Sequence, residues 1–224
     1  LPMGISFYTF QTMAYSIDIY KGKINAEKHL GKFALYVSFF PQLVAGPIER
    51  ADKLLSQFQY NNNKFKFENF ISGSTQLLFG LYKKVVVADL IAIYVESIYG
   101  TFELYTGFTL LLATYLFAIQ IYCDFSGYTD IAIGSARILG YNLMENFKTP
   151  YFSKSITEFW RRWHISLSSW LRDYLYINLG GNRKGKIFTY RNLMITMLLG
   201  GLWHGASWNF VIWGFLHGLY LGIE

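Results

Sequence analysis

The stretch LYTGFTLLLATYLFAIQIYC, residues 104–123, decides the fold class, because its 20 residues include no Asp, Glu, Lys or Arg. An α-helix needs about 20 mainly apolar residues to cross the hydrocarbon core of a bilayer. These residues therefore predict a helix that spans a membrane.

Residues 192–223 form a second run without formal charge, and its 32 positions are too many for one straight span. Glycines interrupt this run at five places, which are Gly200, Gly201, Gly205, Gly214 and Gly218. We therefore predict two helices that are joined near residues 205–209.

Residues 1–17 and 33–48 are shorter runs without charge. The second contains Pro41, Gly46 and Pro47, which leave backbone groups without a partner in a helix. Lipid cannot satisfy such groups. We predict that residues 33–48 form a broken or re-entrant segment packed inside protein.

Four charged residues interrupt the apolar stretch 69–99, namely Lys83, Lys84, Asp89 and Glu96. This pattern predicts a helix, a turn at the membrane interface and another helix. The apolar run 122–141 also contains Asp124, Asp130 and Arg137. Ionisable side chains at membrane depth generally face a bundle interior or a wet cavity. Asp130 and Arg137 lie two helical turns apart, and we expect them to neutralise each other through their neighbours.

The composition agrees with a membrane protein and argues against a soluble one. Charged residues make up 15% of the chain, against about 25% in typical soluble domains. The net charge of +6 does not indicate nucleic acid, because the basic residues fall between apolar stretches and not along one face. Cys123 is the single cysteine of the sequence, so no internal disulfide is possible.

Residues 155–178 predict a different kind of helix. Ser155 and Glu158 match a capping box, which satisfies backbone donors at a helix start. Apolar side chains then recur with the spacing of one helical face, at Trp160, Trp163, Leu167, Trp170, Leu171 and Tyr174. We expect an amphipathic helix at the membrane interface.

The predicted fold class is all-α: a polytopic transmembrane helical bundle with broken or re-entrant segments and an amphipathic interfacial helix. We expect residues 1–224 to form a single membrane-embedded domain, as the central part of a longer protein.

His204 is the first candidate for chemistry, because it lies in the motif GGLWHG inside a charge-free run. An imidazole there can act as a general base near neutral pH. An interhelical hydrogen bond is an equally good interpretation from the residues alone. His29, in a Lys-rich stretch, is interpreted as a solvated loop residue, and His217 as a satisfied core histidine.

His164 lies on the predicted amphipathic helix beside Arg161 and Arg162. These arginines are suited to bind an anionic group such as a nucleotide or carrier phosphate. Equally, they suit interface anchoring or pairing with Glu158. The histidine and cysteine spacings match no metal motif, and Cys123 has no adjacent cation to activate it as a nucleophile.

Five segments in order resemble the membrane-bound O-acyltransferase family, and most closely its bacterial polysaccharide branch, typified by alginate O-acetyltransferases. They are LPMGISFYTFQTMAYSIDIYKG (1–22), FFPQLVAGPIER (39–50), IYCDFSGYTDIAIGSARILGY (121–141), NFKTPYFSKSITEFWRRWHISLSSWLRDYLYINLGGNRKG (146–185) and GGLWHGASWNFVIWGFLHG (200–218).

The resemblance implies a helical bundle around a funnel through the membrane. It places the family's essential histidine at His204 and a second catalytic position at His164. It implies that substrate contacts fall on Arg161, Trp163, Trp203 and Asn209. The implied reaction transfers an acetyl group from a cytosolic thioester, acetyl-CoA or another acyl donor, to a hydroxyl of an exported polysaccharide or a carrier serine. No bound cofactor and no metal is implied.

The resemblance also implies a multi-pass protein of the bacterial inner membrane, surrounded by lipid, that works with a periplasmic or extracellular hydrolase-like acetyltransferase. D-alanyl transfer to teichoic acid is the alternative within the family, although the stretch DYLYINLGGNR at 173–183 favours acetyl transfer. A proton-coupled transporter is the alternative from another class. Transporters usually have two similar halves, which this sequence does not show. A structural membrane subunit is the third alternative.

Overall fold

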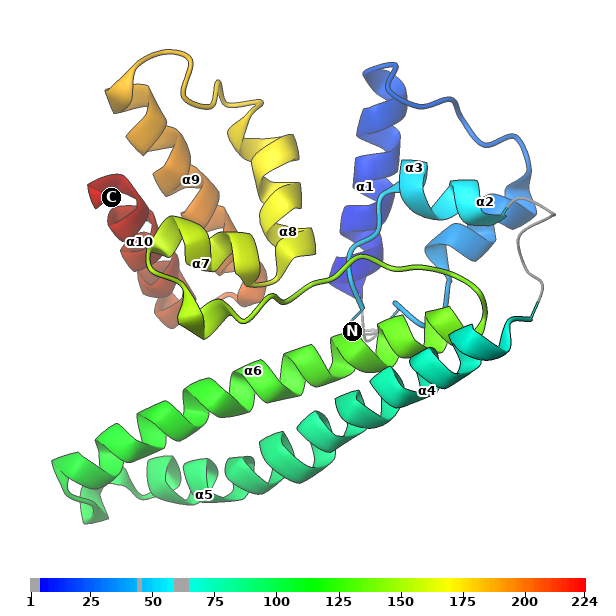
Figure 1. The fold of residues 1–224 in the computed structure, drawn as a ribbon. Helices are drawn as coiled ribbons and strands as arrows, with labels where there is room; N and C mark the ends of the chain where they lie inside the picture. Colours follow the sequence, from blue (N-terminus) through cyan, green and yellow to red (C-terminus); the bar gives the residue numbers. More distant parts are fainter. Residues whose placement is uncertain (1–4, 44–45, 59–64) are drawn as a thin grey trace. The chain divides into compact units, whose positions relative to one another are not determined.

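A computed structural model describes residues 5–43, 46–58 and 65–224. The chain divides into two compact units, Leu1–Glu145 and Asn146–Glu224, and each is described here by itself. Helices account for all the regular structure in the described residues, so the all-α prediction is confirmed for them (Figure 1).

The first unit contains helices of very different length. In order they are α1 (Ile5–Tyr20), α2 (Leu30–Val37), α3 (Ala51–Leu54), the 3₁₀ turn η1 (Leu55–Phe58), α4 (Phe67–Leu81), the π-helical segment η2 (Tyr82–Ala88), α5 (Asp89–Gly100), the 3₁₀ turn η3 (Phe102–Leu104) and α6 (Gly107–Ile138).

Helix α6 contains residues 107–123 of the predicted span 104–123 and ends later than predicted. It begins at Gly107 and continues for 32 residues, so that Asp124, Asp130 and Arg137 belong to the same helix. In the described part of the chain, α6 is the helix that is long and apolar enough to cross a membrane. That finding supports one membrane span, and the polytopic arrangement stays a prediction.

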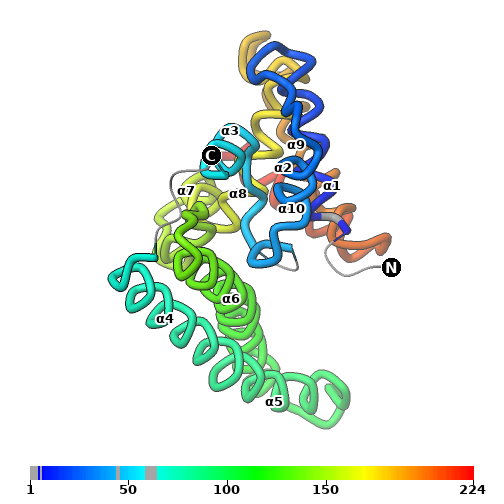
Figure 2. Tube along the Cα trace, turned by 90° about the vertical axis from the view of Figure 1, so that its right-hand side faces the viewer, coloured from blue at the N-terminus to red at the C-terminus, as the bar shows by residue number. Residues whose placement is uncertain are grey.

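The predicted interfacial turn within residues 69–99 is wrong. Helical backbone continues from α4 through η2 into α5, and this long helix packs along α6 as a hairpin (Figures 1 and 2). The two lysines that suggested a turn lie in η2, where both find partners on α6. A π-helical segment takes an extra residue per turn without breaking the helix.

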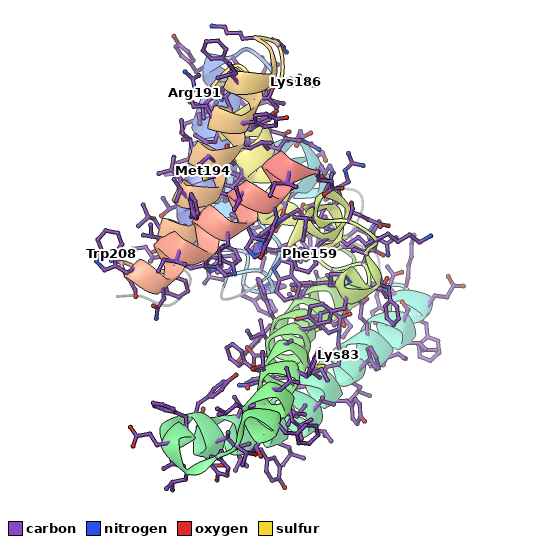
Figure 3. All side chains as sticks on the ribbon, turned by 90° about the vertical axis from the view of Figure 1, so that its left-hand side faces the viewer. Lys83, Phe159, Lys186, Arg191, Met194 and Trp208 are labelled. Atoms are coloured by element: carbon purple, nitrogen blue, oxygen red, sulfur yellow. The ribbon has the colours of Figure 1, made fainter. Side chains whose placement is uncertain are left out.

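Ion pairs explain how these charges fit between apolar helices. Lys83, labelled in Figure 3, forms a salt bridge with Asp130 and donates a hydrogen bond of 3.0 Å to the hydroxyl of Ser126. Lys84 lies 2.7 Å from Asp124. Asp130 is thus paired directly with Lys83 of η2. Its charge is balanced by this lysine and not, as expected, by Arg137.

Glycine lets the backbones of α4 and α6 touch. A Cβ added at Gly73 would lie 2.7 Å from the carbonyl oxygen of Gly134, and one at Gly80 would lie 2.7 Å from that of Gly127. Small residues are what allow such close approach between apolar helices.

The segment after α2 is irregular and buried, as predicted, although residues 44–45 lie outside the described ones. Gly46, Pro47 and Ile48 are all buried. Tyr36, on α2, donates a hydrogen bond of 3.1 Å to the carbonyl oxygen of Glu49. The core of the first unit forms around these residues and includes Phe39, Leu54, Phe58, Ala132, Ile133 and Leu143.

The carboxyl group of Glu49 lies inside this core, with 1% of the residue exposed. It accepts a hydrogen bond from the backbone N–H of Met144, 95 residues away, at 2.5 Å. Burial raises the pKa of Glu49 to about 7, even though the Met144 N–H opposes that shift.

This pKa predicts a pH dependence of stability. Between the ordinary value of 4.5 and about 7, folded Glu49 holds a proton that the unfolded chain releases. Its contribution to stability is therefore complete below pH 4.5 and is lost as the pH rises through about 7. We expect Glu49→Gln to lose this part of the dependence, as measured by thermal unfolding in detergent at pH 5 and pH 8. An unchanged pH dependence in the variant would contradict the assignment.

The second unit is built from shorter elements and one helical hairpin. They are the 3₁₀ turn η4 (Pro150–Phe152), α7 (Ile156–Arg162), α8 (Ile165–Trp170), the π-helical segment η5 (Leu171–Tyr176), α9 (Lys186–His204) and α10 (Trp208–Ile223).

Candidate active site

The charge-free run 192–223 forms two helices with a break between them, as predicted. Helix α9 ends at His204, and α10 begins after Ser207, whose side chain accepts a hydrogen bond of 3.3 Å from the N–H of Asn209. In Figure 3, α9 can be followed from Lys186 past Met194 to the turn, and α10 from Trp208 back along it. His204 therefore lies at the reversal of the chain.

Glycine again brings the two helices into backbone contact. A Cβ at Gly201 would lie 2.3 Å from the carbonyl oxygen of Phe210, and one at Gly214 would lie 2.5 Å from that of Met197. No side chain fits at either place without separating the helices. Gly201 of the motif GGLWHG and Gly214 of α10 thus set how closely the two helices approach each other.

Three aromatic rings surround the His204 imidazole. Trp203 lies 4.9 Å away between ring centroids, Trp213 lies 5.2 Å away with its edge toward the ring, and Phe210 stacks at 5.8 Å. His204 is nevertheless exposed. The rings fix the imidazole and leave a side of it open to a substrate.

The predicted amphipathic helix 155–178 is not continuous. Its start is as predicted, because Ser155 accepts a hydrogen bond of 3.1 Å from the N–H of Glu158. The helix then stops at Arg162, and Trp163 is extended with φ −101° and ψ 127°. His164 takes a left-handed conformation with φ 42° and ψ 56°, after which α8 begins.

His164 occupies a strained and buried position as a result. A left-handed backbone costs a residue with a side chain roughly 1–2 kcal/mol. Only 2% of the residue is exposed, and its ring meets those of Phe147 and Trp203 edge-on. Burial, and then the nearby His204, lower the pKa of His164 to about 3, so its imidazole is neutral at physiological pH.

The structure brings the two histidines, 40 positions apart in the sequence, to one place. The ring of Trp203 lies 6.2 Å from that of His164 and 4.9 Å from that of His204. No group of three His, Cys, Asp or Glu side chains in the described residues is arranged to hold a metal ion.

The other predicted site residues have distinct surroundings. Trp163 stacks on Phe159 at 5.6 Å, and Phe147 meets it edge-on at 5.1 Å. Asn209 is exposed in the first turn of α10, next to the chain reversal. These positions are compatible with substrate contacts, which stay a prediction.

Arg161 faces a cavity of about 450 Å³. Arg172 shares this cavity, whose walls combine hydroxyl groups with apolar side chains; the lining residues include Thr157, Ser168, Ser169, Thr196, Trp160 and Met197. Arg162 has a different role, because its guanidinium pairs with Glu158 at 2.6 Å. Of the two interpretations of these arginines, anion binding thus suits Arg161 and ion pairing holds for Arg162.

His217 also contacts Trp213, which is one of the three rings around His204. The sequence did not predict this contact. The ring of His217 lies 4.5 Å from that of Trp213 and 5.1 Å from that of Trp160. Its Nδ1 atom has no hydrogen-bond partner among the described residues, which does not support a satisfied core histidine. The signal available in the sequence was spacing, because His217 follows Trp213 by four residues on one helical face.

Comparison with known proteins shows the family to which the chain belongs. Residues 26–224 match the family described as MBOAT, membrane-bound O-acyltransferase family. The chain belongs to the membrane-bound O-acyltransferase family. The resemblance inferred from its motifs is therefore confirmed.

Three relatives show the range of similarity. The chain is 52% identical to a probable alginate O-acetylase AlgI of Pseudomonas putida, with all of the chain and 46% of that protein aligned. It is 40% identical to a peptidoglycan O-acetyltransferase of Helicobacter pylori, covering 100% of the chain and 47% of that protein. It is 29% identical to a teichoic acid D-alanyltransferase of Streptococcus thermophilus, covering 99% and 56%. The chain spans about half the length of these relatives.

The glycine contacts of the hairpin predict a sharp difference between two conservative substitutions. Gly201→Ala places a methyl group 2.3 Å from the Phe210 carbonyl oxygen, so we expect a loss of about 1–3 kcal/mol of stability. Gly222→Ala places it 3.7 Å from Tyr190, an ordinary contact, and we expect no loss. Thermal unfolding of both variants measures the difference, and equal melting temperatures would contradict the close packing.

Proposed function

We propose that this chain carries the acyl-transfer centre of a membrane O-acetyltransferase. It moves an acetyl group from a thioester donor towards hydroxyl groups of an exported polysaccharide, with His204 as the general base. The carrying observation is the exposed His204 imidazole, fixed by three aromatic rings and joined to His164 through Trp203.

The difference in exposure supports different roles for the two histidines. A general base must come within hydrogen-bond reach of the proton that it removes. His204 is open to a substrate, so it takes the proton from the acceptor hydroxyl as the oxygen attacks the thioester carbonyl. The tetrahedral intermediate then collapses and the carbon–sulfur bond breaks. The imidazolium of His204 returns the proton to the sulfur, which leaves as a thiol.

His164 supports this step as a neutral group. Its low pKa means that the imidazole is neutral, and a neutral imidazole can donate a hydrogen bond from one ring nitrogen and accept one at the other. A preorganised donor near the reacting carbonyl stabilises the negative charge of the intermediate. We therefore assign His164 to orienting the reacting groups.

The cavity at Arg161 and Arg172 supports an anionic donor. The Arg161 guanidinium and several hydroxyl groups suit a phosphate, whereas the Arg172 guanidinium already pairs with Asp173 at 2.8 Å. The apolar walls suit an uncharged arm that carries the thioester. Acetyl-CoA and a carrier-bound acyl thioester both have this chemistry. Trp163, Trp203 and Asn209 complete the proposed substrate contacts.

The acceptor, partner and location are proposed from the family. Relatives are named for O-acetylation of alginate and of peptidoglycan. We accordingly place the protein in the bacterial inner membrane as a multi-pass protein, with a cytosolic donor and a hydrolase-like partner that completes transfer outside. D-alanyl transfer is the second candidate and has the more distant relative, at 29% identity.

The central prediction concerns His204. In the native host, His204→Ala at matched membrane levels is expected to lower ester-linked acetate by at least about 10²-fold, the usual contribution of a general base. Mild alkali releases the acetate from the envelope for measurement. His29→Ala serves as the matched control, because His29 is an exposed histidine at the start of α2.

The possible outcomes separate the candidates. Acetate lost in His204→Ala and kept in His29→Ala supports the proposal. Loss of ester-linked D-alanine instead assigns the protein to the teichoic acid branch. Unchanged release of both would refute acyl transfer by His204 and leave the transporter interpretation ahead.

A further prediction tests the donor cavity. Arg161→Gln removes the guanidinium that we assign to the donor phosphate, and we expect the KM for the thioester donor to rise roughly tenfold with little change in kcat. Arg162→Gln is the neighbouring control, because that guanidinium pairs with Glu158. Steady-state kinetics in membrane vesicles distinguishes them, and an equal rise in both variants would argue against an anion site at Arg161.

A further inference from the structure

The start of α8 lacks a cap of its own. The first backbone N–H groups of a helix have no partner within it, and the N-cap side chain usually accepts one of these hydrogen bonds. His164 occupies the N-cap position of α8, but its side chain forms no capping hydrogen bond. The N–H groups that follow it are nevertheless buried in the second unit and need acceptors.

Asn146, eighteen residues upstream, provides them. Its carbonyl oxygen accepts a hydrogen bond of 2.9 Å from the N–H of Ile165. Its side-chain Oδ1 accepts two more, each of 3.0 Å, from the N–H and the hydroxyl of Ser166. Asn146 is 1% exposed, so no water competes for these acceptors. It does for α8 what an N-cap residue normally does.

A further hydrogen bond holds the chain on the other side of His164. The N–H of Lys148 donates a hydrogen bond of 2.9 Å to the carbonyl oxygen of Arg162, the last residue of α7. The segment from Asn146 to Lys148 is thus tied to the chain both before and after the left-handed turn. A strained conformation persists only where its surroundings fix it.

We propose that Asn146 is a positioning residue that acts through His164. By capping α8 from outside, it holds His164 in its left-handed turn and frees the imidazole from the capping role, so that the ring stays buried against Trp203. The part of this proposal that concerns activity rests on the proposed function of His164, whereas the capping itself does not.

Chemical labelling tests the cap directly. Diethyl pyrocarbonate acylates accessible neutral imidazoles, and peptide mass spectrometry reads each histidine separately. In the full protein in membranes, His164 is expected to label far more slowly than the exposed His204. In Asn146→Ala, we expect the rate at His164 relative to His204 to rise roughly 3- to 30-fold, the range that corresponds to loss of a helix cap.

Two further variants make the test specific. Asn192→Ala removes an equally buried asparagine of the same unit, whose side-chain amide donates a hydrogen bond of 2.9 Å to the carbonyl oxygen of Gly181. This variant should leave the labelling of His164 unchanged. Ser166→Ala removes only the hydroxyl bond to Asn146 and should raise the labelling roughly 2- to 10-fold. It decides the question by itself if Asn146→Ala does not accumulate.

Unchanged labelling of His164 in Asn146→Ala or Ser166→Ala would overturn the proposal, and so would an equal rise in Asn192→Ala. The activity measurement is separate. If Asn146 acts through His164, acetyl transfer should fall in Asn146→Ala and His164→Ala, and the double variant should be no worse than His164→Ala. Increased labelling with unchanged acetyl transfer would keep the cap and refute the proposed role of His164.

Discussion

Backbone contact at glycine between α9 and α10 is the constraint on which the candidate site depends. The carbonyl oxygens of Phe210 and Met197 lie where a side chain of Gly201 or Gly214 would have to go. The helices can therefore reverse direction within a short turn, with His204 at the end of the first and its aromatic neighbours at the start of the second. A wider hairpin would separate the imidazole from Phe210 and Trp213, which are the rings that hold it.

The first unit uses the same kind of contact together with ion pairs. Glycines bring α4 and η2 against α6, and lysines of η2 then meet aspartates of α6 across the interface. Charges of opposite sign at short range favour each other more strongly where water is scarce. The hairpin can therefore include four charged side chains between helices that are otherwise apolar.

The sequence predicted the features that depend on local composition. Runs without charge located α6 and the α9–α10 hairpin, and the motif Ser155–Glu158 located the start of α7. Sequence-based prediction failed where residues far apart in the chain determine the local conformation. Lysines at 83 and 84 indicated a turn, because the aspartates of α6 with which they pair lie 40 or more positions later. The apolar periodicity of residues 155–178 continues across the break at His164, and the acceptors that stabilise the break come from Asn146.

The different surroundings of the two histidines follow from the fold and not from the residue type. Both are imidazoles beside Trp203, and both follow a tryptophan in the sequence. His204 ends a helix at an open turn, where a substrate hydroxyl can reach it. His164 lies in a turn that buries it and keeps it neutral, so it can exchange hydrogen bonds but cannot meet solvent. The proposed acyl transfer needs a base that takes the hydroxyl proton and a donor that stabilises the charge on the carbonyl oxygen, and the two surroundings match these two needs.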